Sequence, residues 1–184
     1  LSRIKSLLNE SYVRGYELLA KNQLLFNLQQ IIDYKKNHFG DKAYFKQLVN
    51  LWDKNLNIIG NDINIFENFL AIRSLVLPIE QEYTKYLDLV KICRKLNFFN
   101  KGEKVLLRLK NKLIQNDKKE TKNSMIKEIY TTIDLNYNKC LFEKGQIQES
   151  IKRSKNLVDL LDNSFSNSNK NSENNLSELS DKIK

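Results

Sequence analysis

Histidine, cysteine, proline and glycine are all scarce in this sequence of 184 residues, which contains one His, two Cys, one Pro and five Gly. With His38 alone, the chain cannot build a zinc site on two or three His ligands, and a Ser-His-Asp triad would have a single candidate base. The two Cys cannot form a disulfide framework, which favours a reduced, intracellular protein. We therefore expect no metal and no cofactor.

Long apolar runs and an N-terminal targeting signal are also missing. No stretch approaches the roughly 18 consecutive apolar residues that a membrane span requires, and no basic segment followed by an apolar one opens the chain. We therefore expect no membrane span and a cytoplasmic location. The first residue is Leu1 rather than Met, so we expect either a fragment of a longer protein or a trimmed chain.

The chain does contain enough apolar residues for a core, 41% of the total, together with an excess of positive charge. Its 31 Lys+Arg and 22 Asp+Glu give a net charge of +9, which is typical of nucleic-acid-binding proteins. The excess is almost all Lys, scattered singly, whereas Arg, which suits bidentate phosphate contacts, occurs only six times. A solvated surface is therefore favoured over a nucleic-acid patch.

Apolar residues recur at intervals of three and four, which predicts helices throughout and no strands. We expect two helices first, over 3–21 and 24–36, with a break near 21–23. Caps and breakers mark the next boundaries, namely Asp41 and Gly60 for a third helix and Asp62 and Pro78 for a fourth. A charged connector over 116–120 then separates two further pairs of helices.

Each of these later pairs contains a similar turn. Segments 97–103 and 145–151 combine a turn former, an apolar anchor and a small residue, as in the hairpin of a tetratricopeptide repeat. The anchor fills the space between the two helices, and the small residue lets them approach closely. The turn formers are Asn97 and Gly145, the anchors Phe99 and Ile147, and the small residues Gly102 and Ser150. We predict an all-α fold, an α-solenoid of antiparallel hairpins of tetratricopeptide or HEAT type.

The candidates for chemistry are few. Residues 39–41 look like a shuffled kinase metal-binding motif, but no catalytic loop, phosphate loop or paired strand Lys accompanies them. His38 beside them is expected to be an exposed loop residue. Trp52 and the two Cys, at 93 and 140, are expected to pack in the core. We therefore expect no catalytic residue in this chain.

Arg73 interrupts an apolar run over 69–77. Its stem is expected to pack while the guanidinium reaches a carboxylate at the helix end, where a cation also complements the helix dipole. The alternative is a contact with a neighbouring domain.

From about residue 163 the composition changes to Ser and Asn. Such a segment cannot bury enough apolar surface to offset the conformational entropy that it would lose on folding. The expected division is a repeat segment over 1–162 and a disordered tail over 163–184.

Several segments resemble, in order, the FAT region of target of rapamycin protein kinases. They are 11–16 with Tyr12 and Arg14, 28–35, 51–56 with Trp52, 72–77 with Arg73, and 93–95. Residues 139–145 resemble a later repeat of the same region. The similarity covers about residues 8–161, and its most specific part is Arg73 to Val76.

The resemblance implies a helical repeat arm that braces a phosphatidylinositol-kinase-related Ser/Thr kinase domain. It also implies a dimeric parent that couples nutrient and energy signals to growth with Raptor-like or Rictor-like and Lst8-like subunits, in the cytoplasm or at endomembranes. The chain shows no kinase lobes, so no catalytic residue is carried over and the segment itself is not expected to be an enzyme. The structural and interaction candidates are Tyr12, Arg14, Trp52, Arg73, Phe99, Gly102, Gly145, Ile147 and Ser150.

Two other functions stay open at this level. One is a stand-alone tetratricopeptide-like adaptor that grips a peptide in its concave groove, which groove-lining Asn, Lys and Arg would favour. The other is a basic helical-repeat RNA-binding protein, which a steep dependence of RNA affinity on salt would distinguish. A small-molecule substrate is not expected.

Overall fold

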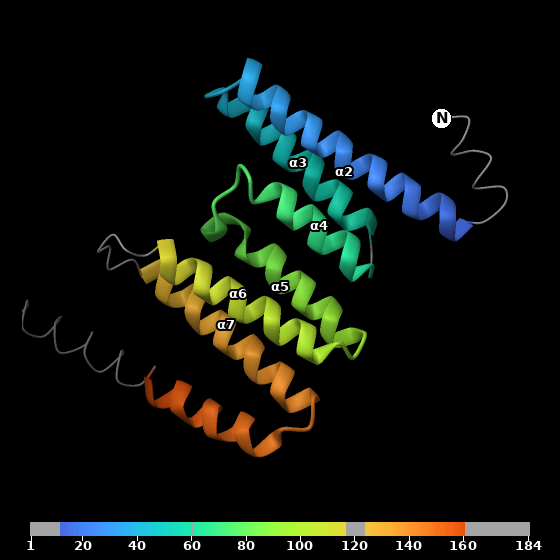
Figure 1. Ribbon diagram of the computed structural model, residues 1–184. Coiled ribbons are helices and arrows are strands. Elements are labelled where there is room, and N and C mark those ends of the chain that lie inside the picture. Colours follow the sequence, from blue (N-terminus) through green and yellow to red (C-terminus); the bar gives the residue numbers. More distant parts are fainter. Residues whose placement is uncertain (1–11, 60, 117–123, 161–184) are drawn as a thin grey trace, which may run out of the picture.

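The described part of the chain consists of helices joined by short connections. The computed structural model describes residues 12–59, 61–116 and 124–160, and these ranges contain no strand. The elements are α2 (Tyr12–Asn37), α3 (Lys42–Ile59), α4 (Ile63–Arg73), α5 (Ile79–Lys95), α6 (Phe99–Asn116), α7 (Ser124–Glu143) and a last helix over 147–160. They stack side by side in chain order (Figure 1). The predicted all-α repeat fold is confirmed.

Some expectations concern residues that lie outside these ranges. They are the helix start over 3–11, the cap at Gly60, the connector over 117–120 and the tail over 163–184. The division into 1–162 and 163–184 therefore stays a prediction.

Asp residues begin two of the helices, as the sequence predicted. Asp41 Oδ1 accepts hydrogen bonds from the backbone N–H groups two and three residues later, at 2.9 and 3.0 Å. Asp62 Oδ1 accepts the equivalent pair, both at 3.0 Å. Each side chain satisfies N–H groups that have no partner within their own helix, which stabilises such a helix start by about 1 kcal/mol.

Two expected boundaries are wrong. The break near 21–23 does not exist, because α2 runs without interruption from Tyr12 to Asn37. Polar residues without Pro or Gly lower helix propensity only slightly, and the Gln23 side-chain amide donates to Asn27 Oδ1 one turn later at 3.0 Å. Pro78 does not stop α4 either, since that helix ends at Arg73 and Pro78 is the N-cap of α5.

The hairpin turns after α5 and after α7 have the same geometry. Asn97 has a φ of 61° and Gly145 a φ of 88°, both in the left-handed region. The next N–H in each turn bonds back to the fifth residue before it, Phe98 to Cys93 at 2.8 Å and Gln146 to Leu141 at 2.9 Å. This is the Schellman pattern of a helix C-terminus. The predicted alignment of the two turns, 48 residues apart in number, is confirmed.

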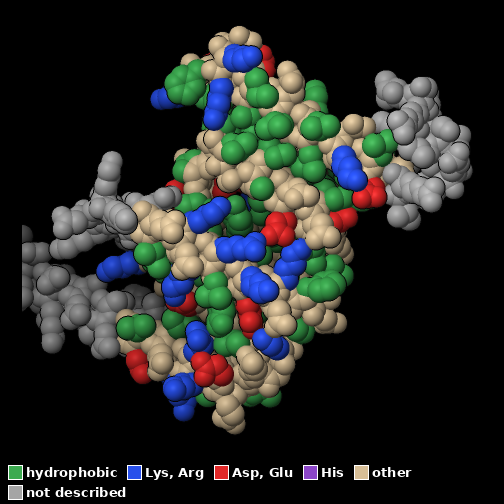
Figure 2. All heavy atoms as spheres, viewed as in Figure 1, with side chains coloured by type: hydrophobic (Ala, Val, Ile, Leu, Met, Phe, Trp, Pro, Cys, Tyr) green, Lys and Arg blue, Asp and Glu red, His purple; other side chains and the backbone are tan. Residues whose placement is uncertain are grey.

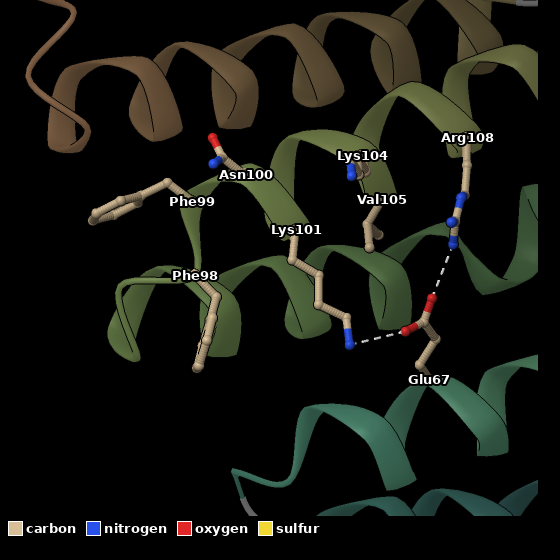
Figure 3. Close-up of a pocket in the computed structure, with 8 residues that line it drawn as sticks. All are labelled: Glu67, Phe98, Phe99, Asn100, Lys101, Lys104, Val105 and Arg108. Carbon is tan, nitrogen blue, oxygen red and sulfur yellow. Dashed lines mark hydrogen bonds and ion pairs between the residues drawn. The ribbon is translucent and has the colours of Figure 1, made fainter.

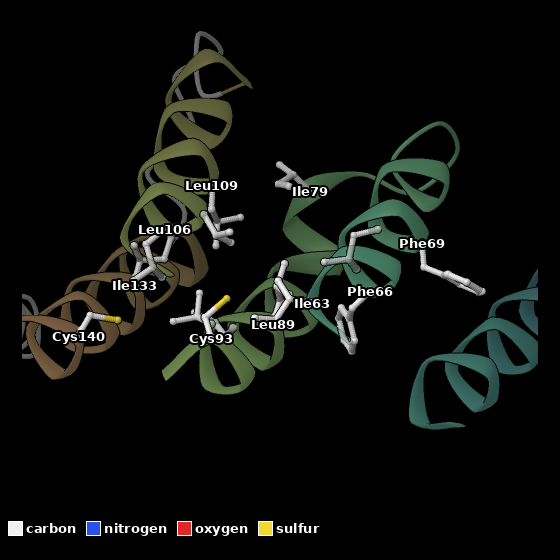
Figure 4. Packing of buried hydrophobic residues seen from close by; sticks show 14 of the residues in the cluster. Ile63, Phe66, Phe69, Ile79, Leu89, Cys93, Leu106, Leu109, Ile133 and Cys140 are labelled. Atoms are coloured by element: carbon white, nitrogen blue, oxygen red, sulfur yellow. The ribbon is translucent and has the colours of Figure 1, made fainter. Parts of the chain in front are cut away.

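Two groups of buried apolar side chains hold the stack together. The larger group extends from Leu56 of α3 through α7, and Figure 4 shows part of it. The smaller group lies between α2 and α3 and includes Leu77 from the segment before α5. Its fully or nearly buried members are Ile31, Leu48, Trp52 and Leu77. The polar residues that lie between these two cores are the first place to look for a function.

Candidate functional site

Arg73 is a charged side chain with only 1% of its surface exposed, at the last residue of α4. Its Nε donates to Glu82 Oε2 at 2.6 Å, and its Nη2 donates to Glu82 Oε1 at 2.7 Å. Glu82 is 5% exposed and comes from the first turn of α5. The guanidinium therefore meets a carboxylate, as expected, but on the following helix rather than at the end of its own.

Side chains from α3 and α5 complete the cluster. Asp53 Oδ1 lies 2.9 Å from Arg73 Nη2 and 3.5 Å from Lys85 Nζ. The Arg73 guanidinium carbon is 5.9 Å from the centroid of the Trp52 ring, within range of a cation–π interaction. Trp52 is fully buried, and its Nε1–H donates to Gln30 Oε1 on α2 at 2.9 Å. We call these residues the Arg73 cluster: Trp52, Asp53, Arg73, Glu82 and Lys85.

The charges of the cluster balance, because Arg73 and Lys85 face Asp53 and Glu82. Burial acts to lower the pKa of the Arg73 guanidinium, but the hydrogen bond and charge of Glu82, followed by those of Asp53, raise it above its usual value. Arg73 is therefore permanently charged, and both carboxylates are engaged by a cation. Such a cluster has no free base and fixes the positions of helices instead.

Exposed ion pairs connect the later helices. The Arg94 guanidinium of α5 binds the Glu143 carboxylate of α7 through two hydrogen bonds, which lowers the pKa of Glu143. Lys110 Nζ of α6 lies 2.8 Å from Asp134 Oδ1 of α7. Figure 3 shows a third case, in which two cations of α6 converge on Glu67 of α4. No local pattern indicates these pairs, because their members are 24 to 49 residues apart in the chain.

The hairpin candidates lie in different environments. Gly102 is buried, and Ser150 is 6% exposed with its hydroxyl donating to Asn138 O at 3.3 Å. Phe99 is half-buried. Ile147 is 47% exposed, so the expectation that it fills the space between two helices is wrong. Gly145 lies in an open turn with no atom within 4 Å of the position a Cβ would take.

Three other expectations have different outcomes. Tyr12 and Arg14 lie in the first turn of α2, and their side chains are outside the described part of the structure. Cys93 and Cys140 are fully buried, as predicted. His38 is half-buried rather than exposed, because its ring stacks on Tyr44 with the centroids 4.0 Å apart.

Two kinds of site are absent from the part of the chain that the structure describes. No group of three or more His, Cys, Asp or Glu side chains could hold a metal ion. No helix in the same ranges is long and apolar enough to cross a bilayer.

Comparison with known proteins identifies the family. The whole chain, residues 1–184, matches the FAT domain. This chain belongs to the FAT domain family. No solved structure matches it.

The curated relatives of this FAT segment are Ser/Thr protein kinases named TOR. It is 33% identical over 92 residues to tor1 of Schizosaccharomyces pombe, which covers 50% of this chain and 4% of that protein. It is 26% identical over 154 residues to TOR2 of Saccharomyces cerevisiae, 83% of this chain and 6% of that protein. TOR of Arabidopsis thaliana is 25% identical over 111 residues, 59% of this chain and 4% of that protein. The segment therefore spans a small part of each relative.

Two substitutions of Gly102 in the FAT segment test the helix packing, because they are expected to change the free energy of unfolding in opposite directions. A Cβ at this position would lie 3.5 Å from both Cys140 Sγ and Cys93 Cβ, which is ordinary van der Waals contact. We expect Gly102→Ala to raise the free energy of unfolding by about 0.5–1 kcal/mol, because Ala has the better helix propensity. We expect Gly102→Leu to lower it by about 1–3 kcal/mol through overpacking. Urea unfolding followed by circular dichroism measures both changes.

Gly145→Ala is the matched control. Its φ of 88° disfavours an L-residue although the site is open, so the same substitution should destabilise by about 1 kcal/mol. Equal effects of Ala at the two positions, or an unchanged stability of Gly102→Leu, would contradict the packing around Gly102.

The Cys140 thiol is expected to make the free energy of unfolding of the FAT segment fall as the pH rises in the alkaline range. Burial raises its pKa from 9.0 to about 11, against the lowering effect of the Arg94 charge. The folded thiol keeps its proton where an unfolded thiol loses it, so its contribution is complete below pH 9.0 and is lost as the pH rises through about 11. We expect the stability advantage of wild type over Cys140→Ala to shrink by about 2 kcal/mol between about pH 8 and pH 11. Urea unfolding of both proteins tests this, and a constant difference would show that the thiol does not titrate with folding.

Proposed function

We propose that this FAT segment is a non-catalytic helical arm of a TOR-like Ser/Thr protein kinase and that it braces the kinase domain of the same chain. The observation that carries the proposal is the Arg73 cluster, which joins α4 to α5 through a buried ion pair and to α3 through the half-buried Asp53. An arm that holds another domain in register needs fixed angles between its helices. A buried bidentate pair favours one such angle, because both of its hydrogen bonds are satisfied in a single geometry.

The ion pairs among α4, α5, α6 and α7 support the same role. Each exposed pair contributes at most about 1 kcal/mol, but together they connect helices that are distant in sequence. Figure 2 shows Lys and Arg side chains across the middle of one face with Asp and Glu side chains among them, rather than a purely basic stripe. Apart from the row of cations on α6, this mixture favours a protein scaffold over an RNA-binding surface.

The proposal extends to the partners of the parent protein. The arm would contact its own kinase domain and Raptor-like or Rictor-like and Lst8-like subunits in a homodimer. It would act in nutrient and growth signalling in the cytoplasm, with the parent complex associated with endomembranes. The resemblance to target of rapamycin kinases implies these partners, and the exposed apolar side chains of the last helix, at 147, 151 and 158, provide surface for such contacts.

The first test is the transcript that encodes the chain. Sequencing it downstream of codon 184 is expected to show a kinase domain in frame, and a stop codon with no kinase domain before it would overturn the proposal.

The second test addresses bracing in the intact parent. Arg73→Met is expected to lower kinase activity and to increase cleavage by a protease, while the double variant Arg73→Met/Glu82→Leu restores both towards wild type. An active parent whose kinase activity is the same in wild type and Arg73→Met would show that the arm does not brace the kinase.

A further inference from the structure

Three adjoining hollows form a groove along α6, with α4 as the opposite wall of the first two and α5 as the floor of the last two. Their volumes are about 440, 160 and 210 Å³. The first two share Glu67 and Arg108 in their walls, and the second and third share Tyr86 and Lys112. We call this feature the α4–α6 groove.

The α6 wall of the groove is basic. Lys101, Lys104, Arg108 and Lys112 follow one another at intervals of three or four residues, which places them along one face of the helix. Of the carboxylates among the described lining residues, Glu82 is buried and bound by Arg73. Glu67 is the other, and its side chain is 35% exposed. The groove surface therefore has four cations and a single accessible carboxylate.

The pairing within the groove is incomplete. Lys101 Nζ lies 3.2 Å from one oxygen of Glu67, and Arg108 Nη1 lies 2.9 Å from the other (Figure 3). Lys104 and Lys112 are exposed and have no carboxylate partner among the residues that the structure describes. About three positive charges are left without compensation along this wall.

The middle hollow of the groove is largely apolar, whereas the other two mix polar and apolar surface. Leu89 of α5 and Leu109 of α6 lie beneath its middle hollow and are almost fully buried, so the accessible apolar surface there comes from Ala71, which is exposed, and Tyr86, which is half-buried. Phe98 lines the first hollow and is 56% exposed, although it is a large aromatic side chain at a hairpin turn. An occupant that suits this groove has acidic groups along one edge and apolar groups facing the floor.

We propose that the α4–α6 groove binds an acidic, extended peptide segment of a partner protein. Lys101 and Lys112 are eleven residues apart on α6, or about 16 Å, which an extended peptide covers with about five residues. Alternate side chains of such a peptide point to opposite sides, so Asp or Glu residues meet the α6 wall while apolar residues reach the floor. The inference does not depend on the bracing role.

Glu67 is the internal competitor in this arrangement. Its carboxylate occupies the positions on Lys101 and Arg108 that an Asp or Glu of the peptide takes in the complex. Neutralising Glu67 without changing its shape therefore frees two cations for the ligand. A residue with only a structural role in the groove would not improve binding when it is changed.

The experiment measures binding of two labelled peptides to the full 184-residue chain by fluorescence anisotropy. One peptide has about ten residues that alternate Glu or Asp with Leu or Phe, and the other has Gln and Asn in place of the acids. Glu67→Gln is expected to bind the acidic peptide about 3-fold more tightly, and Lys104→Glu/Lys112→Glu at least about 10-fold more weakly. Wild-type binding is expected to weaken as salt rises.

Lys139→Glu on α7 is the charge control, because Lys139 is exposed and lies outside the groove. It should change the affinity by less than about 2-fold, and circular dichroism should show the same helix content in every variant. Equal binding of the acidic and the neutral peptide would overturn the proposal. So would tighter binding of polyuridylate RNA than of the acidic peptide, or a loss of affinity in Lys139→Glu as large as that in the groove variant.

Discussion

Replacing Arg73 by Met is expected to lower the free energy of unfolding by about 3–5 kcal/mol. The substitution removes the cation that binds Glu82, whose side chain is only 6% exposed and cannot be solvated in place. It also removes a partner of Asp53, although that side chain is 35% exposed and keeps Lys85 nearby. Most of the loss therefore comes from a carboxylate left buried without a partner. Urea unfolding at neutral pH, followed by circular dichroism, measures it.

Two variants separate this explanation from a loss of packing. Arg73→Met/Glu82→Leu removes both buried charges and is expected to recover most of the stability, because well-packed apolar residues can replace a buried ion pair at little cost. Arg108→Met makes the same substitution in an exposed pair, where the side chain is 68% exposed, and should cost at most about 1 kcal/mol. Equal losses in Arg73→Met and Arg108→Met, or no recovery in the double variant, would show that the buried pair is not what stabilises this region.

Local signals in the sequence predicted the boundaries of several helices. Asp41 and Asp62 are N-caps because a short carboxylate reaches the first free N–H groups of its own helix. Asn97 and Gly145 are helix ends because both tolerate a positive φ. In each case the interaction lies within a few residues of the chain, so the printed sequence contains the information that is needed.

The relations between helices could not be predicted in the same way. Asp53 and Arg73 are 20 residues apart, and nothing in the spacing of either indicates that α3 and α4 bring them together. The continuity of α2 was missed because the polar residues at 21–23 lower helix propensity only slightly, and the hydrogen bond from Gln23 to Asn27 lies within the same helix. Ile147 fits the hairpin pattern, yet its burial depends on the position of elements outside the hairpin. Tertiary packing thus determines which residues of different helices come into contact, and local sequence patterns do not indicate these contacts.

Replacing Trp52 by Ala is expected to lower the free energy of unfolding by about 3–5 kcal/mol. The ring is fully buried in the small core and covers one side of the Arg73 guanidinium, so its loss leaves a large cavity beside a buried charge. Trp52→Phe keeps much of the packing but removes the hydrogen bond to Gln30, and a smaller loss of about 1–2 kcal/mol is expected. Trp52 is the one Trp of the chain, so circular dichroism rather than intrinsic Trp fluorescence must follow unfolding in both variants.

Ile58→Ala is the control for Trp52, since Ile58 lies on the same helix α3 and is 81% exposed. Its substitution should change stability by no more than about 0.5 kcal/mol. If Trp52→Ala were no more destabilising than Ile58→Ala, the small core between α2 and α3 would contribute little to the fold. Trp52 contacts both Gln30 of α2 and Arg73 of α4. If Trp52→Ala lost more free energy of unfolding than a cavity of this size accounts for, α2 and the Arg73 cluster would have to unfold together.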